Sequence, residues 1–260
     1  MIPNLRMAII LTILIACNQP QQPGTHSMPH VQKAEQNKNP YTTVGCIPLP
    51  EGYSRAAAEK KSFAEWLSAL PLKKSKTVYL YNGLPKRNQA AQFAVINVSV
   101  GNKDLQQCAD AVMRLRAEYL YSQKKFNEII FWDNNNTAYK LGTFTNRKYF
   151  DAYLNNVFAR CGTLSLEKQL RPVKGLDNLQ PGDVLIQGGS PGHAMMVVDM
   201  AVNNSGKKIY MLAQSYMPAQ DVHIVINPAN KNGDPWYELN NETIITPEWA
   251  FPKGHFKTWP

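Results

Sequence analysis

Three side chains in this sequence are of the types needed for covalent chemistry on an amide bond: Cys108, His193 and Gln214. A cysteine thiolate attacks a carbonyl carbon, an imidazole takes and returns the proton, and a polar side chain holds the imidazole in one tautomer. Together they predict amide hydrolysis or acyl transfer through a thioester. Their separation in sequence means that the fold must bring them together.

Cys108 is predicted to lie in the first turn of a helix. The helix follows Gly101 and Asn102, and Asp104 is a plausible N-cap. Unpaired backbone N–H groups and the positive end of the helix dipole favour thiolate over thiol at such a position. The alternative is that Cys108 is a small buried apolar group, since free cysteine is often buried. The helix is indicated by apolar side chains at helical spacing, namely Leu105, Val112, Leu115 and Tyr119.

His193 and Gln214 are predicted to lie at the same end of a β-hairpin. A Pro-Gly turn and a glycine-rich loop lead to His193, which opens a strand at 194–200. The turn at 203–206 leads into a second strand at 208–215, near whose end Gln214 lies. Antiparallel strands place the start of one beside the end of the next, so we expect the two side chains to be neighbours. His223 alternates with apolar residues and is expected to be structural.

Other local patterns predict two helices and several strands. Ser62 and Glu65 form a capping pattern that begins a short helix, and Pro71 ends it. Further elements are predicted by apolar periodicity: strands at 78–81, 93–100 and 129–132 and a helix at 147–159.

The first residues have the pattern of an export signal. A charged start, a short apolar run and Leu14-Ile15-Ala16-Cys17 resemble a bacterial lipoprotein signal. That resemblance implies a signal peptide at 1–16, acylation of Cys17 and a lipid anchor on the bacterial cell envelope, facing the periplasm or the exterior. A plain secretory leader is the alternative. Residues 17–43 are polar and predict a disordered tether, and 44–260 predict a single domain.

Charge and cysteine content limit the partners. The 260 residues carry a formal net charge of +9, and removal of 1–16 takes away only Arg6. A basic exported protein suits anionic cell-wall polymer or lipid headgroups, and no nucleic-acid motif is present. Acylation of Cys17 would leave an odd number of cysteines, so a disulfide between Cys46 and Cys161 would leave Cys108 free. No residue cluster has metal-ligand spacing, so we expect no metal and no cofactor.

Two resemblances extend this interpretation. The run Pro181-Gly182-Asp183-Val184, followed by Gly192-His193-Ala194 and an apolar strand, resembles the NlpC-type and CHAP-type papain-like cysteine peptidases of bacterial cell walls. The chain from Ile47 to Pro218 is similar to an uncharacterised family of bacterial lipoproteins, domain of unknown function 4846.

The first resemblance implies an α+β, papain-like domain, with the cysteine helix packed on an antiparallel sheet built largely from 183–226. It also implies a catalytic triad with Cys108 as nucleophile, His193 as base and Gln214 as the polar third member, and peptidoglycan stem peptides as substrate. The alternative is a catalytically inactive envelope lipoprotein that acts as a binding or scaffolding module.

Overall fold

The computed structural model describes residues 37–143 and 146–260. The predicted signal peptide at 1–16, Cys17 and most of the predicted tether lie outside the described residues. No helix in the described part is long and apolar enough to cross a membrane. The described part contains 3-10 helices, α-helices and strands in this order: η1 (Val44–Cys46), β1 (Tyr53–Arg55), α2 (Phe63–Ser68), β2 (Gln92–Val95), α3 (Cys108–Ser122), η2 (Phe126–Glu128), β3 (Ile130–Trp132), β4 (Ala138–Lys140), α4 (Arg147–Phe158), α5 (Thr163–Gln169), β5 (Arg171–Pro172), η3 (Leu176–Asn178), β6 (Val184–Gln187), β7 (His193–Asn203), β8 (Lys208–Gln214), β9 (His223–Val225), β10 (Trp236–Glu238), β11 (Ile244–Ile245), β12 (Ala250–Phe251) and β13 (Phe256–Thr258).

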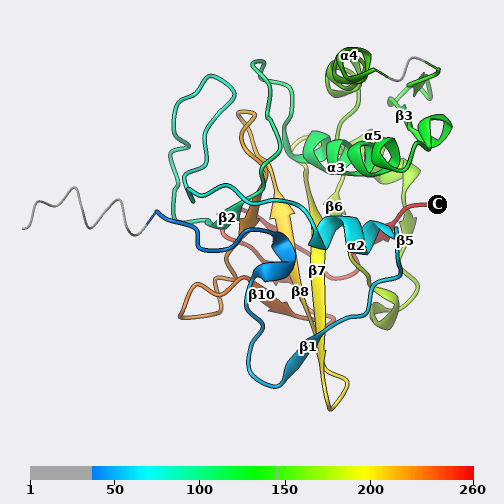
Figure 1. Ribbon diagram of the computed structural model, residues 1–260. Coiled ribbons are helices and arrows are strands. Elements are labelled where there is room, and N and C mark those ends of the chain that lie inside the picture. The colour runs from blue at the N-terminus through cyan, green and yellow to red at the C-terminus, as the bar shows by residue number, and fades with distance from the viewer. Residues whose placement is uncertain (1–36, 144–145) are drawn as a thin grey trace, which may run out of the picture. The chain divides into compact units, whose positions relative to one another are not determined.

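Nine of these strands form one antiparallel sheet. Its order is β2-β9-β8-β7-β6-β13-β5, while β1 also pairs with β7 and β10 also pairs with β8. The long strand β7 runs through the middle of the sheet, and α2 and α3 lie over it (Figure 1). The remaining strands of the described residues form two small two-stranded sheets, β3-β4 and β11-β12.

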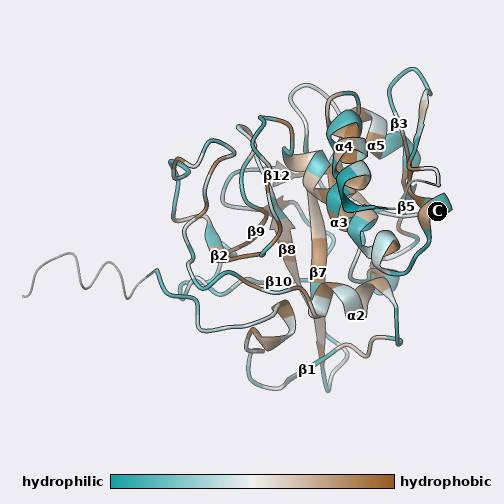
Figure 2. Cartoon of the chain, turned by 45° about the horizontal axis from the view of Figure 1, so that its top comes forward, coloured by the Kyte–Doolittle hydropathy of each residue, from teal (hydrophilic) through white to brown (hydrophobic). Residues whose placement is uncertain are grey.

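Strand β7 is buried on both faces, which explains its almost continuous apolar sequence. Alternate side chains of a strand point to opposite faces, so the strand contributes to two separate cores. The apolar colouring of β7 and β8 in Figure 2 follows this burial. One core includes Ala194, Met196 and Val198, and the other includes Met195, Val197 and Met200.

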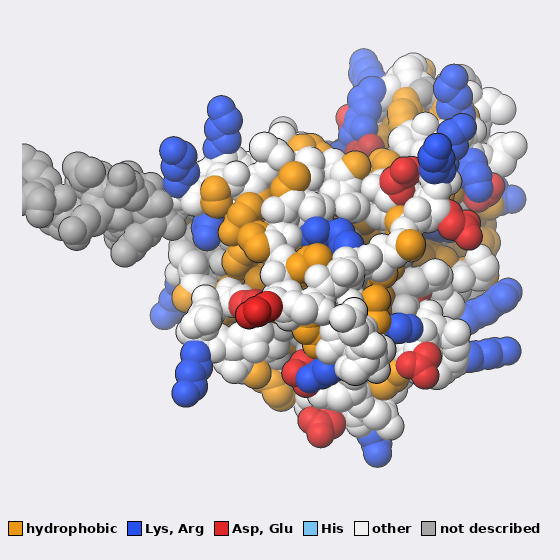
Figure 3. Space-filling view, turned by 60° about the horizontal axis from the view of Figure 1, so that its bottom comes forward, with side chains coloured by type: hydrophobic (Ala, Val, Ile, Leu, Met, Phe, Trp, Pro, Cys, Tyr) orange, Lys and Arg blue, Asp and Glu red, His pale blue; other side chains and the backbone are white. Residues whose placement is uncertain are grey.

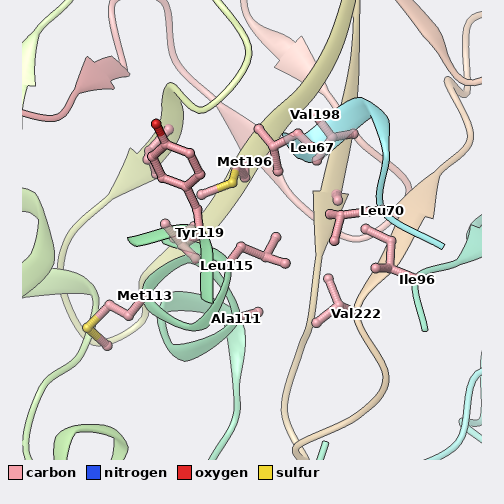
Figure 4. Close-up of a cluster of buried hydrophobic side chains, with 14 of the residues drawn as sticks. Leu67, Leu70, Ile96, Ala111, Met113, Leu115, Tyr119, Met196, Val198 and Val222 are labelled. Atoms are coloured by element: carbon pink, nitrogen blue, oxygen red, sulfur yellow. The ribbon is translucent and has the colours of Figure 1, made fainter. Parts of the chain in front are cut away.

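The first core joins the sheet to α2 and α3. Leu67 of α2 and Leu115 of α3 lie close to Met196 and Val198 of β7 (Figure 4). Helix α2 begins as predicted, because the Ser62 hydroxyl accepts the backbone N–H of Glu65 at 3.2 Å. Packing of these helices fixes the position of the residue that opens α3.

The expectation of a papain-like α+β domain is wrong. The structure is mainly an antiparallel sheet with four α-helices in the described residues. The sheet was expected to come largely from 183–226, but it also recruits β1, β2, β5, β10 and β13. Most of these strands have only two or three residues, too few to show the period-two alternation that marks a strand in sequence.

The helices and strands agree with those predicted from the sequence to different degrees. The hairpin of β7 and β8 and the helix α4 lie where they were predicted. The predicted strand at 78–81 is absent, since only the isolated bridges of Tyr79 with Pro85 and Leu80 with Gln220 occur there. The predicted strand at 93–100 shortens to β2.

The domain begins to form contacts before residue 44. Lys38 bridges to Ser75 and Thr43 bridges to Pro71. Asn39 is buried and its side-chain amide donates to the carbonyl of Lys73 at 2.8 Å. The last residues of the predicted tether are therefore attached to the segment that follows α2.

Candidate functional site

Cys108 is the first residue of α3, in the first turn as predicted. Gln107 is the N-cap in extended conformation, and the Asp110 carboxylate accepts the Gln107 backbone N–H at 3.0 Å. The prediction of Asp104 as N-cap is wrong, because Asp104 lies before the helix and accepts the backbone N–H of Ala219 at 2.7 Å. The free backbone N–H groups of the helix start thus lie around the cysteine.

The Cys108 thiol is buried, with 8% of the residue exposed. It lies near the backbone of Ala194, the residue that follows His193. Burial, and then the negative charge of Asp110, raises the pKa of the thiol to about 11. The predicted lowering of this pKa by the helix start is therefore wrong. Cys108 is a protonated thiol at neutral pH.

His193 opens β7 and contacts Gln214 as predicted, with 2.7 Å between Nε2 of the histidine and Oε1 of the glutamine. The orientation of the Gln214 amide follows from its other partner, because its Nε2 donates to the Glu248 carboxylate at 2.8 Å. The carbonyl oxygen of Gln214 therefore faces His193, and a carbonyl only accepts. His193 carries its proton on Nε2, which leaves Nδ1 free to accept a proton.

The imidazole of His193 lies among aromatic rings. Its centroid is 4.9 Å from that of Tyr216, 5.4 Å from that of Trp249 and 5.8 Å from that of Phe251. Burial lowers the pKa of His193 to about 4, against the opposing effect of the Gln214 hydrogen bond. His193 is therefore neutral at pH 7, which is the protonation state of a general base.

A groove of about 310 Å³ lies beside Cys108. Its walls come from the start of α3, the turn before α5 and the loop between β6 and β7, and they include Cys161, Thr163 and Gly192. His193 and Gln214 lie behind this surface, each 1% exposed, and do not line the groove. The structure thus places the thiol at the groove and the two polar partners behind it.

Three further residues, His223, Glu248 and Lys86, form a network around the Gln214 side chain, and sequence reasoning missed Glu248 and Lys86. Glu248 pairs with Lys86 at 2.7 Å, and Lys86 is only 6% exposed. His223 is fully buried; its Nδ1 donates to the carbonyl of Asp221 at 2.9 Å and its Nε2 accepts from Gln214 at 3.2 Å. The prediction of a structural His223 agrees with its burial. Lys86 and Glu248 lie in loops without a motif, so no sequence signal identified them.

The three described cysteines are free. Cys46 is exposed, whereas Cys108 and Cys161 are buried. The disulfide between Cys46 and Cys161 that the cysteine count allowed is absent. Within residues 37–143 and 146–260, no group of three or more His, Cys, Asp or Glu side chains could hold a metal ion.

A larger hollow of about 590 Å³ contains none of the predicted site residues. It lies beside α2 and the C-terminal half of α3, where the Arg116 guanidinium is 5.4 Å from the ring centroid of Phe63, 5.7 Å from that of Tyr119 and 5.3 Å from that of Trp259. Three rings around one guanidinium form a packing cluster, because cation–π contacts of this kind stabilise an arginine without an ion partner.

The fold and the site define an antiparallel β-sheet domain in which a helix-start cysteine adjoins a buried histidine–glutamine pair. The chain belongs to the family described as domain of unknown function (4846), which matches residues 45–144 and 133–258. Comparison with curated proteins and with solved structures gives no match.

Proposed function

We propose that this domain is a thiol-dependent hydrolase or acyl transferase that acts on amide bonds, with Cys108 as nucleophile, His193 as base and Gln214 as the residue that orients the base. One observation carries the proposal. The Cys108 thiol lies near the backbone of Ala194, the residue that follows His193 in β7, and Nε2 of His193 is 2.7 Å from Oε1 of Gln214. A nucleophile, a base and an orienting group are the three parts of such a site.

The protonation states determine the mechanism. The thiol and the imidazole are both neutral at pH 7, so the proton moves from Sγ to Nδ1 of His193 as the sulfur attacks the carbonyl carbon. Backbone N–H groups at the start of α3, including that of Cys108, stabilise the resulting oxyanion. Collapse of this intermediate breaks the C–N bond, and His193 returns the proton to the leaving amine. A thioester on Cys108 remains.

Water or an acceptor amine then resolves the thioester. His193 takes a proton from the incoming nucleophile, the carbonyl carbon is attacked again, and the thiol of Cys108 leaves and recovers its proton from His193. The products are a carboxylic acid and the free enzyme when water attacks, or a new amide when an amine attacks.

We propose peptide amides of the bacterial cell envelope, such as peptidoglycan stem peptides, as the substrate class. The resemblance of the segments 181–184 and 192–194 to cell-wall cysteine peptidases supports this choice, as does the predicted acylation of Cys17, which would anchor the domain at the envelope. The net charge of +9 suits an anionic polymer. Lys and Arg side chains project at several places on the face shown in Figure 3.

A second function, that of a catalytically inactive binding or scaffolding module, is favoured by a specific observation. His193 and Gln214 are each 1% exposed and the Cys108 thiol is buried, so little of the three side chains is accessible to a substrate. A domain that had lost catalysis could keep the same buried hydrogen bonds for stability alone.

Digestion of purified cell wall tests the two functions. Wild-type protein is expected to release new peptide fragments, read by mass spectrometry, while Cys108→Ala and His193→Ala release none, because they remove the nucleophile and the base. Cys46→Ala is the matched control, since it removes an exposed cysteine outside the groove and should keep activity. Equal binding of wild-type and Cys108→Ala protein to the wall, with no product from either, would establish the binding module instead.

A further inference from the structure

The Gln214 side chain is held at three points. Its Oε1 accepts from His193, and its Nε2 donates both to Glu248 at 2.8 Å and to His223 at 3.2 Å. These partners come from β7, from β9 and from the segment before β12, so separate parts of the sheet converge on one amide. All are buried or nearly so, with the Glu248 side chain 13% exposed.

We propose that Glu248 is a positioning residue for His193 that acts through the amide of Gln214, with Lys86 as its buried counter-charge. This inference rests on the proposed function and adds to it the group that supplies negative charge to the site. The predicted orienting group is a neutral amide, which stabilises an imidazolium less than a carboxylate does. Glu248 places a carboxylate one hydrogen bond beyond the Gln214 amide, as seen from His193.

The first effect of Glu248 is on orientation. If the Gln214 amide rotated by half a turn, its N–H group would meet the Nε2–H of His193, and its oxygen would meet the Glu248 carboxylate. Both contacts would be repulsive, because the first brings two hydrogen-bond donors together and the second brings two acceptors together. His223 adds to this restraint, since its Nδ1 donates to Asp221 and its Nε2 can only accept. Glu248 and His223 thus fix the amide, and the amide fixes the Nε2–H tautomer of His193.

The second effect is on charge. An N–H donated to a carboxylate polarises the amide, and chains of hydrogen bonds strengthen one another by about 10–30% per bond. The carbonyl oxygen of Gln214 then holds the His193 imidazolium more strongly when this ion forms during the attack by Cys108. Glu248 therefore acts through the polarised amide, while burial and then the positive charge of Lys86 lower the pKa of His193 and oppose the imidazolium.

Lys86 has a separate part in the network. Its ammonium contacts Glu248 at 2.7 Å and lies 3.5 Å from Nε2 of His223. The buried ammonium pairs with the Glu248 carboxylate and fixes it in place. The other titratable groups that face His193 are His223 behind Gln214, Tyr216 against the ring and the thiol of Cys108 near Ala194.

The tautomer of His193 can be measured without any substrate. In full-length protein with ¹⁵N-labelled histidine, long-range ¹H–¹⁵N NMR should report His193 as the Nε2–H tautomer at pH 7. Glu248→Gln should give a mixture of both tautomers, while Glu248→Asp should restore the Nε2–H form in part. Glu238→Gln, which removes a surface carboxylate of β10, is the matched control and should leave His193 unchanged.

Activity gives the second readout. Glu248→Gln should lower kcat by about ten- to a hundredfold with little change in KM, the size of effect found when a hydrogen-bond partner that orients a functional histidine is removed. If the unpaired Lys86 prevents folding, the double variant Lys86→Met with Glu248→Gln removes both buried charges and should show the same tautomer mixture. An unchanged Nε2–H tautomer in either folded variant would overturn the inference. If the variants change the tautomer of His193 but the wild-type protein cuts no cell wall, the proposed hydrolase is refuted. The positioning role of Glu248 then remains.

Discussion

Cys46 and Cys108 differ in both properties that decide the reactivity of a thiol. Cys46 is exposed, and hydrogen bonds from Thr42 and then Thr43, at 3.4 and 3.2 Å, lower its pKa. Cys108 is buried, and its pKa is raised to about 11. Since thiolate fraction and access control alkylation, Cys46 is the more reactive of these two thiols, rather than the proposed nucleophile Cys108.

Iodoacetamide labelling should therefore modify Cys46 before Cys108 and Cys161 at neutral pH. The rate at Cys108 should increase up to a pH of about 11, because the thiol loses its proton only there. Peptide mapping by mass spectrometry resolves the individual cysteines, and Cys46→Ser is the control for labelling at the exposed site. A rate at Cys108 that is already maximal at pH 7 would instead indicate a preformed thiolate–imidazolium pair with His193.

The sequence predicted the position of Cys108 correctly, but it did not predict the protonation state of its thiol. The position of Cys108 at a helix start follows from local spacing, and the hydrogen bond of His193 with Gln214 follows from the hairpin. The pKa of the thiol depends on burial by distant segments and on the charge of Asp110, and burial outweighs the effect of the helix start. No window of sequence reports such burial.

At the scale of elements, the short strand β1 is attached to β7 by an ion pair as well as by its backbone. Arg55 Nε lies 2.6 Å from the Asp199 carboxylate, and a second guanidinium nitrogen donates to the carbonyl of Ile47 at 2.8 Å. Asp199 is nearly buried, and burial raises its pKa against the opposing effect of Arg55. Loss of the arginine would leave a buried carboxylate with one fewer partner.

Arg55→Met should therefore lower the free energy of unfolding by about 1–3 kcal/mol, the cost of leaving a buried polar group without its partner. Urea denaturation measures this change. Lys207→Met is the matched control, because it breaks an ion pair with Glu238 at the exposed surface, where solvent screens the charges, and should have a clearly smaller effect. Equal losses in the two variants would contradict a special role for the β1 attachment.

Local elements were predictable and long-range pairings were not. The hairpin of β7 and β8 and the helices α3 and α4 have signals within one window of sequence. The pairing of β13 with β5 and β6 has no such signal, nor has the meeting of Lys86 with Glu248. The papain-like expectation failed for the same reason, since the strands that make the sheet so large are contributed by distant short segments.

At the scale of the whole molecule, several buried groups have a raised pKa that opposes loss of their proton. Burial raises the pKa of Cys108 to about 11 and of Cys161 to about 12, and it also raises the pKa of Tyr153, Tyr210 and Tyr237. Each group keeps its proton in the folded state at a pH where the unfolded chain has lost it. The folded state therefore binds more protons at alkaline pH, and its stability falls as pH rises.

The stability of the domain should decrease as pH rises above about 9, where unfolded cysteine begins to titrate, by up to ~1.4 kcal/mol per pH unit for each such group. Thermal unfolding at a series of pH values measures the decrease as a lower Tm. The double variant Cys108→Ala with Cys161→Ala should flatten the curve between about pH 9 and 10, before the tyrosines contribute. A Tm that is constant from pH 8 to 11 would show that these groups titrate alike in both states.

The place of β13 in the sheet has a consequence for the order in which the domain forms. β13 lies between β6 and β5, and β5 has no other partner in the sheet. Residues 256–258 are made long after β6, so a growing chain holds an open edge at β6 until this segment emerges. Pairings between segments so distant in sequence are slow to form, because a long loop must close first. The edge of the sheet at β6 therefore closes only after this segment has left the ribosome.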